Sequence, residues 1–167
     1  MSFKQTKEKE LIFMSTLISA QTYAEDNTVL IKSMVQCSNG DYILVGDYYV
    51  NSSTTAAYAI RVASDGSTVC KKIFTSVFSV FFKSITKISD ESFIAVGSYF
   101  YSIFSGDEYT WIVNLDGERN IIYQKALGTV NIQSDGLDVC STLDGGYAVS
   151  SLIVEHGKGS SVISKFN

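Results

Sequence analysis

The chain matches itself without a gap when it is shifted by 51 residues. The matching pairs include Lys32-Ser33 with Lys83-Ser84, Val45-Gly46 with Val96-Gly97, and Asp65-Gly66 with Asp116-Gly117. Self-similarity at a fixed period of roughly 20–50 residues is typical of repeat architectures, in which one unit cannot bury its apolar face alone. The repeat therefore predicts a stack of similar supersecondary units rather than a single irregular core.

Turn-forming residues divide each copy into short apolar runs that have the alternation of a β-strand. In one such run, Tyr58, Ile60 and Val62 alternate with smaller or charged residues, as expected for a strand with a side-chain period of two. The expected strands span 29–37, 42–49, 58–63 and 68–74 in the first copy, 80–88, 93–101, 109–115 and 119–127 in the second, and 137–143, 147–154 and 162–166 in the third. Four short antiparallel strands per unit are typical of a β-propeller blade.

The expected architecture is thus all-β and β-propeller-like, with about three four-stranded antiparallel blades near 29–75, 80–127 and 135–167. The repeat domain would cover residues 25–167. The third copy lacks its fourth strand. Closed propellers usually have four to eight blades, so the chain is interpreted as a partial propeller or as half of an oligomeric ring. A partial propeller would belong to a longer propeller, and half of a ring would self-associate.

Residues 1–24 have two interpretations. The segment 8–17 repeats the order of glutamate, aliphatic, aromatic and leucine residues found in 118–127, so it could supply the missing fourth strand of the last blade. The same region also resembles a secretory signal peptide, with Lys4, Lys7 and Lys9 before an apolar stretch and a small-residue cleavage site at Ala24. The apolar stretch is too short to cross a bilayer, and no membrane span is expected elsewhere.

Several turns share a pattern that extends beyond the repeat itself. Asn39-Gly40-Asp41-Tyr42, Val45-Gly46 and Asp65-Gly66 resemble the blade repeats of bacterial exported β-propeller-like proteins and lipoproteins. Asp144-Gly145-Gly146-Tyr147 is the closest match, although Ser150-Ser151 replaces the glycine that should follow. The resemblance implies a propeller-like fold and an extracellular or cell-envelope location, with the cytoplasm as the alternative.

Composition and motifs argue against several function classes. The net charge is −4 and the basic residues are scattered, so a nucleic-acid partner is not expected. The three cysteines, Cys37, Cys70 and Cys140, have no metal-binding spacing. They are expected to pack as half-buried thiols, with one disulfide and one free thiol as the alternative for an exported chain. His156 is the single histidine and has only Glu155 nearby as a partner, and Asp65, Asp116 and Asp144 are interpreted as turn formers. We therefore expect no enzyme activity, no metal and no cofactor.

The loops between the second and third strands of each copy vary while the strands agree, and binding residues often lie on such loops. These loops span residues 51–57, 102–108 and 155–160. Aromatic residues in and beside the second loop suit a protein or glycan contact. The candidate binding residues are Phe100, Tyr101, Phe104, Tyr109 and His156. The sequence thus predicts a non-enzymatic binding or scaffold module, with a fragment of a larger propeller enzyme as the alternative.

Overall fold

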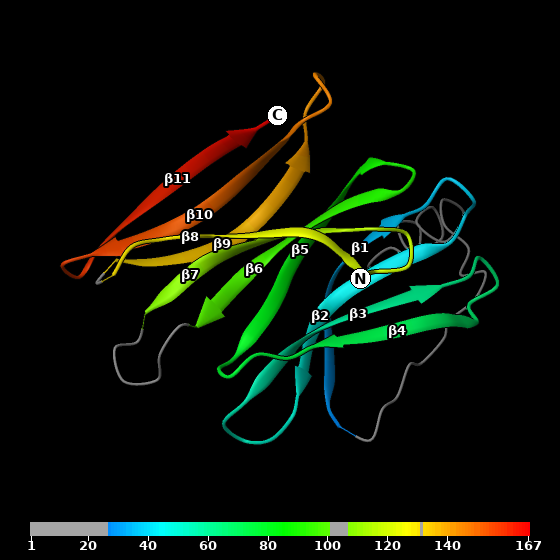
Figure 1. Cartoon of the computed structure of the whole chain (residues 1–167), viewed down its shortest axis with the longest axis horizontal. Helices are drawn as coiled ribbons and strands as arrows, with labels where there is room; N and C mark the ends of the chain where they lie inside the picture. The colour runs from blue at the N-terminus through cyan, green and yellow to red at the C-terminus, as the bar shows by residue number, and fades with distance from the viewer. Residues whose placement is uncertain (1–26, 101–106, 131) are drawn as a thin grey trace, which may run out of the picture.

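The computed structural model describes residues 27–100, 107–130 and 132–167. These residues form three antiparallel sheets (Figure 1). Sheet 1 contains β1 (Val29–Gln36), β2 (Tyr42–Tyr49), β3 (Thr55–Val62) and β4 (Thr68–Phe74); sheet 2 contains β5 (Val80–Ser89), β6 (Ser92–Phe100), β7 (Glu108–Leu115) and β8 (Ile121–Leu127); sheet 3 contains β9 (Gln133–Ser141), β10 (Tyr147–Glu155) and β11 (Lys158–Phe166). The all-β, partial propeller-like arrangement expected from the repeat is confirmed, and it is not closed.

Strand boundaries differ from the sequence prediction mainly where a loop was expected. β3 begins at Thr55, and its Ala56 and Ala57 are buried rather than part of a loop. The predicted loop at 155–160 is wrong, because β10 and β11 pair as far as Glu155 with Lys158. His156 and Gly157 form this two-residue turn with φ values of 49° and 74°, a geometry that keeps the strand twist continuous through a tight hairpin.

The 51-residue shift also gives the wrong structural equivalence for the third strand and for the turn after it. Strand register places Tyr58 opposite Gly46 and Trp111 opposite Gly97, so the partner of Trp111 is Tyr58 rather than Ile60. In the next turn, the residue with positive φ is Gly66 in sheet 1 and Arg119, with a φ of 61°, in sheet 2. Asp116-Gly117 is therefore not the equivalent of Asp65-Gly66, because hydrogen-bonded pairing rather than letter matching sets equivalence.

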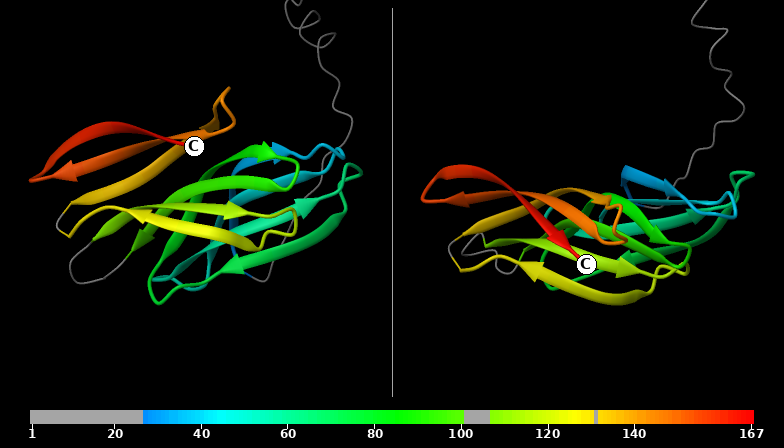
Figure 2. Two further views of the ribbon diagram at one scale, coloured as in Figure 1. Left: turned by 45° about the horizontal axis from the view of Figure 1, so that its top comes forward. Right: turned by 90° about the horizontal axis from the view of Figure 1, so that it is seen from above.

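The three sheets stack in chain order, each through its first strand (Figure 2). β5 packs on β1, β2 and β3, and β9 packs on β5, β6 and β7. The junction between sheets 1 and 2 buries a large apolar core that includes Val45, Phe82 and Trp111. The junction between sheets 2 and 3 has a smaller core that includes Val96 and Val149. Trp111 thus packs between two repeat units.

Glycines inside the second strands mark a close approach of two backbones. A Cβ on Gly46 would lie 1.9 Å from the carbonyl oxygen of Leu30, and a Cβ on Gly97 would lie 1.9 Å from that of Phe81. Both sites adjoin a β-bulge, at Lys32 in β1 and at Lys83 in β5. In both cases the neighbour is the first strand of the same sheet.

The N-terminal segment 1–24 lies outside the described residues, so both of its interpretations stay predictions. Sheet 3 has three strands, and β11 forms its outer edge. No helix among the described residues is long and apolar enough to cross a membrane.

Candidate functional site

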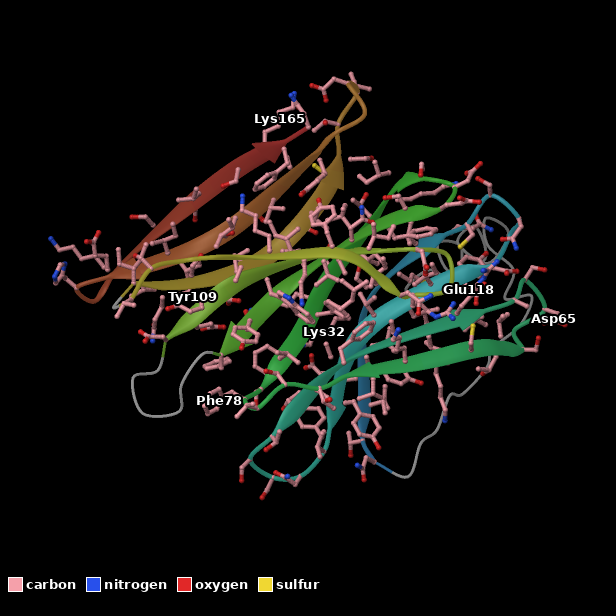
Figure 3. The ribbon with its side chains drawn as sticks, viewed as in Figure 1. Lys32, Asp65, Phe78, Tyr109, Glu118 and Lys165 are labelled. Carbon is pink, nitrogen blue, oxygen red and sulfur yellow. The ribbon has the colours of Figure 1, made fainter. Side chains whose placement is uncertain are left out.

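The predicted aromatic binding residues are only partly brought together. Tyr101 and Phe104 lie outside the described residues. The ring of Phe100, at the end of β6, meets Phe81 edge to face with 5.5 Å between centroids. Tyr109 is half-buried at the start of β7 (Figure 3), and its ring covers Gly128 so closely that a Cβ there would lie 2.0 Å from Cδ1. Phe100 and Tyr109 thus pack within sheet 2 and leave little free aromatic surface.

His156 lies in the β10–β11 turn and does not join these aromatic residues in any contact of the described chain. Its side chain is 92% exposed, and its Nδ1 is 3.8 Å from Glu155 Oε1. At 3.8 Å this contact is longer than a hydrogen bond, so it does not hold the exposed imidazole in one orientation. The residue therefore serves the turn, as its positive φ indicates.

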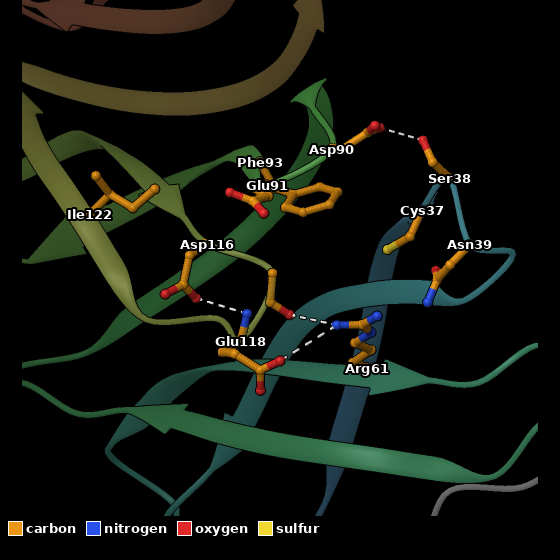
Figure 4. A pocket seen from close by; sticks show the side chains of 11 residues that line it. Cys37, Ser38, Asn39, Arg61, Asp90, Glu91, Phe93, Asp116, Glu118 and Ile122 are labelled. Atoms are coloured by element: carbon orange, nitrogen blue, oxygen red, sulfur yellow. Dashed lines mark hydrogen bonds and ion pairs between the residues drawn. The ribbon is translucent and has the colours of Figure 1, made fainter.

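A cleft of about 580 Å³ lies between sheets 1 and 2, at the strand ends where the turns of both sheets meet (Figure 4). Three turns contribute to it: β1–β2, β5–β6 and β7–β8. The lining residues are Cys37, Ser38, Asn39, Arg61, Asp90, Glu91, Phe93, Asp116, Gly117, Glu118 and Ile122. The cleft forms because the sheets touch through their first strands and diverge toward the outer ones.

Arg61 of β3 joins the two walls of the cleft. Its guanidinium donates to Asp41 Oδ2, 2.9 Å from Nε, on its own sheet. It also donates to the carbonyl oxygen of Gly117, at 3.1 Å, on the β7–β8 turn of sheet 2, and Glu118 Oε1 lies 3.7 Å away. Hydrogen bonds from Asn39 and Arg61 lower the pKa of Asp41. Asp41 therefore stays ionised and keeps the guanidinium in place.

The remaining charges at the cleft are mostly carboxylates on well-defined turns. Asp90 accepts hydrogen bonds from Lys87, at 2.6 Å, and from Ser38, which lower its pKa. Asp116 Oδ1 accepts from the backbone N–H of Glu118 at 2.8 Å and of Asn120 at 2.7 Å. Its turn-forming role, like that of Asp65 toward the Ser67 N–H, is confirmed. The rim is therefore held by its own hydrogen bonds, and its carboxylates outnumber the cations beside them, which are Arg61, Lys87 and Arg119.

The floor of the cleft is apolar and chemically inert. Phe93 is fully buried, and Ile122 on β8 is exposed toward the cleft opening. Burial raises the pKa of the Cys37 thiol, so it stays protonated, and a thiol rather than a thiolate is a weak nucleophile. The arrangement suits a group with a positive charge and an aliphatic stem, such as a lysine or arginine side chain.

A second group of charges lies between sheets 2 and 3, near the bulge of β5. Lys83 Nζ is 2.5 Å from Asp135 Oδ1 on β9, and the hydroxyl of Ser98 donates to the same carboxylate. Burial, with the negative charge of Asp135 nearby, raises the pKa of Glu108. Lys32 makes a comparable contact with Asp47 inside sheet 1, at 2.5 Å. These contacts join strands and sheets, so they hold the stack together rather than open a site.

Sequence reasoning missed the cleft, because its walls come from turns in different copies. A signal was available: the β5–β6 and β7–β8 turns of the second copy carry four carboxylates, and alternate turns of an antiparallel sheet lie at the same end of its strands. The described residues hold no group of three or more His, Cys, Asp or Glu side chains that could bind a metal ion.

No protein-family model and no curated protein sequence matches this chain.

Proposed function

We propose that the chain is a non-enzymatic, propeller-type binding module whose cleft receives a basic segment of a protein partner. The observation that carries this proposal is the combination of four rim carboxylates with an apolar floor in one cleft. Charge on a rim attracts an oppositely charged partner and raises its association rate. The floor provides the desolvated contact that a flexible basic side chain needs for affinity.

The turns that form the cleft are held by their own hydrogen bonds, so little ordering is required on binding. Pre-organised surfaces lose less conformational entropy when a partner docks. The resemblance of the turn pattern to exported propeller-like proteins supports an extracellular or cell-envelope location for this module. A protein partner is favoured over a glycan because the aromatic residues that suit a sugar ring, Phe100 and Tyr109, are packed within sheet 2.

The test is titration of the full chain with an octa-lysine peptide by calorimetry at low ionic strength. Glu118→Gln, at a side chain that is 69% exposed on the rim, should weaken binding roughly tenfold when combined with Glu91→Gln. Glu155→Gln is the matched control for Glu118→Gln alone, since each removes one carboxylate charge from an exposed side chain. Equal weakening by the control, or no weakening by the rim variants, would remove the proposal.

A further inference from the structure

The two junctions between sheets repeat one geometry, so strand register identifies equivalent positions in all three sheets. Each second strand carries an aromatic residue at or next to its start: Tyr42, Phe93 and Tyr147. Two residues further on lie Leu44, Ala95 and Val149, and the first-strand residues opposite them are Met34, Ile85 and Val139. Three residues further on lie Val45, Val96 and Ser150, and the third-strand residues opposite them are Ala59, Ile112 and Ile163.

The first set marks the side of a sheet that docks onto its predecessor. Ile85 belongs to the core between sheets 1 and 2 and is 5% exposed, while Val139 belongs to the core between sheets 2 and 3 and is 6% exposed. Met34 occupies the same position in sheet 1 and is 65% exposed. The docking side of β1 therefore presents an apolar residue to solvent where its two equivalents are buried.

The second set marks the side of a sheet that receives its successor. Ala59 and Ile112 are fully buried beneath the following sheet, whereas Ile163 of β11 is 79% exposed. Around Ile163, the same face of β10 presents Ala148, Ser150 and Leu152, all half-buried. Asp138 of β9 lies opposite Ser150, so the face carries one carboxylate beside its apolar residues. It continues the series of faces that receive a sheet in the two established junctions.

The two ends of the stack are thus complementary in kind. At one end the docking strand β1 exposes Met34, while Tyr58, Ile60 and Val62 on the same face are only 1–4% exposed. At the other end the receiving face exposes Ile163. We propose that a second copy of this chain packs its β1 on the β9–β11 face of the first, in the geometry of the two internal junctions. Such a contact joins different surfaces of the two copies, and it forms a closed ring when the rotation allows. Two copies would provide six sheets, within the range of closed propellers.

This contact does not involve the carboxylate cleft, so the dimer can be tested independently of the proposed function. The test measures the mass of the full chain by analytical ultracentrifugation over a range of concentrations. The wild type should form dimers. Met34→Asp and Ile163→Asp should each raise the dimer dissociation constant roughly 100-fold or more, because an unpaired carboxylate would be buried in the contact.

Mixing the two variants separates this arrangement from any symmetric one. In an equal mixture, intact Ile163 of the Met34→Asp chain can still receive intact Met34 of the Ile163→Asp chain, so mixed dimers should reappear. Val77→Asp is the control, since Val77 is 86% exposed on the β4–β5 connection, and it should dimerise like the wild type. Circular dichroism and the unfolding midpoint check that each variant is folded.

Three results would overturn the proposal. The wild type could stay monomeric at the highest concentration. Dimerisation could depend on Ile163 and not on Met34, with no recovery on mixing, which would indicate two copies of sheet 3 face to face. The chain could form open-ended polymers instead of dimers, which would show that two copies do not close a ring.

Discussion

Phe82 and Gly136 occupy the same register position in sheets 2 and 3, opposite Gly97 and Ser151, respectively. In the first junction, Phe82 is fully buried and stacks on Trp111 with 5.0 Å between ring centroids and an interplanar angle of 4°. In the second junction, the backbone replaces the ring, since a Cβ on Gly136 would lie 2.6 Å from the carbonyl oxygen of Gly97.

The second junction also has polar contacts around Gly136. In the second junction, the hydroxyl of Thr110 is 2.8 Å from that of Ser134 and donates to that of Ser151 at 3.1 Å. Ser84 donates to Asp138 at 2.5 Å, and Lys83 pairs with Asp135. At this register position, the first junction is thus filled by aromatic packing and the second by close backbone approach with hydrogen bonds nearby. The hydrogen bonds between sheets in the first junction, from Arg61 to Gly117 and from Ser38 to Asp90, lie at the cleft instead. The two junctions should therefore respond differently to cavities, added volume and pH.

The largest effect is expected from Phe82→Ala. Removing a fully buried ring leaves a cavity beside Trp111, which should lower the free energy of unfolding by about 3–5 kcal/mol. Phe81→Ala is the matched control, because Phe81 neighbours Phe82 on β5 but is only half-buried. Chemical denaturation measures both. A loss for Phe82→Ala no greater than that of the control would mean that the aromatic stack is not what stabilises the first junction.

Gly136→Ala tests the second junction by adding volume instead of removing it. The new methyl group would meet the backbone of β6 and the side chains of Val96 and Thr110, each within 3 Å, so we expect a loss of about 1–3 kcal/mol. Gly117→Ala is the control, because the nearest atom to a Cβ there is 3.9 Å away. Equal stability of the two variants would contradict the close approach.

Asp135→Asn tests the charged contact across the second junction. Lys83 would keep its charge in a partly buried position and lose its nearest carboxylate, and we expect a loss of about 1–2 kcal/mol. Asp144→Asn removes the partner of Lys165, a pair whose side chains are about half exposed, and should cost less than about 0.5 kcal/mol. The two losses are compared by denaturation at one ionic strength, and a reversal of their order would show that the junction does not depend on Asp135.

The smallest effect is a pH dependence at Glu108. Because its pKa is raised in the folded chain, folding favours the protonated carboxyl. This contribution is complete below the ordinary value of 4.5 and is lost as the pH rises through the raised pKa. Lys83, Asp135 and Ser98 are the charged and polar groups around it. Glu108→Gln should therefore raise the unfolding midpoint at pH 8, and this gain should disappear near pH 4. A gain that grows on acidification would reverse the assignment.

Much of the fold was predictable because it depends on local patterns. β2 and β4 begin and end where alternation and turn residues place them, and Gly46 and Gly97 were recognisable as points of close backbone approach. The errors fall where a local signal competes with pairing. Polar residues near Thr55 and Lys158 look like loops, yet the neighbouring strand extends the ladder through them. Asp116-Gly117 resembles the turn it was matched to, but the register assigns the positive φ to Arg119.

The candidate site was less predictable than the fold. The loop hypothesis directed attention to Phe100 and Tyr109, which the structure uses for packing. The cleft needs Arg61 of one sheet beside Glu118 of another, and no local pattern reveals the offset between two stacked sheets. The cysteines show the same limit of local patterns. All three were expected to be half-buried, but Cys37 is buried, Cys70 is intermediate and Cys140 is exposed.

From its sequence alone, this chain is a tandem array of short strands, because alternation, turn residues and the internal repeat act over neighbouring residues. The tertiary structure decided how the sheets stack, which turn carries a strained residue, and which charges meet at the cleft and in the junctions. Those outcomes depend on the register between strands and on the packing of one sheet on another, where side chains from distant copies compete for the same space.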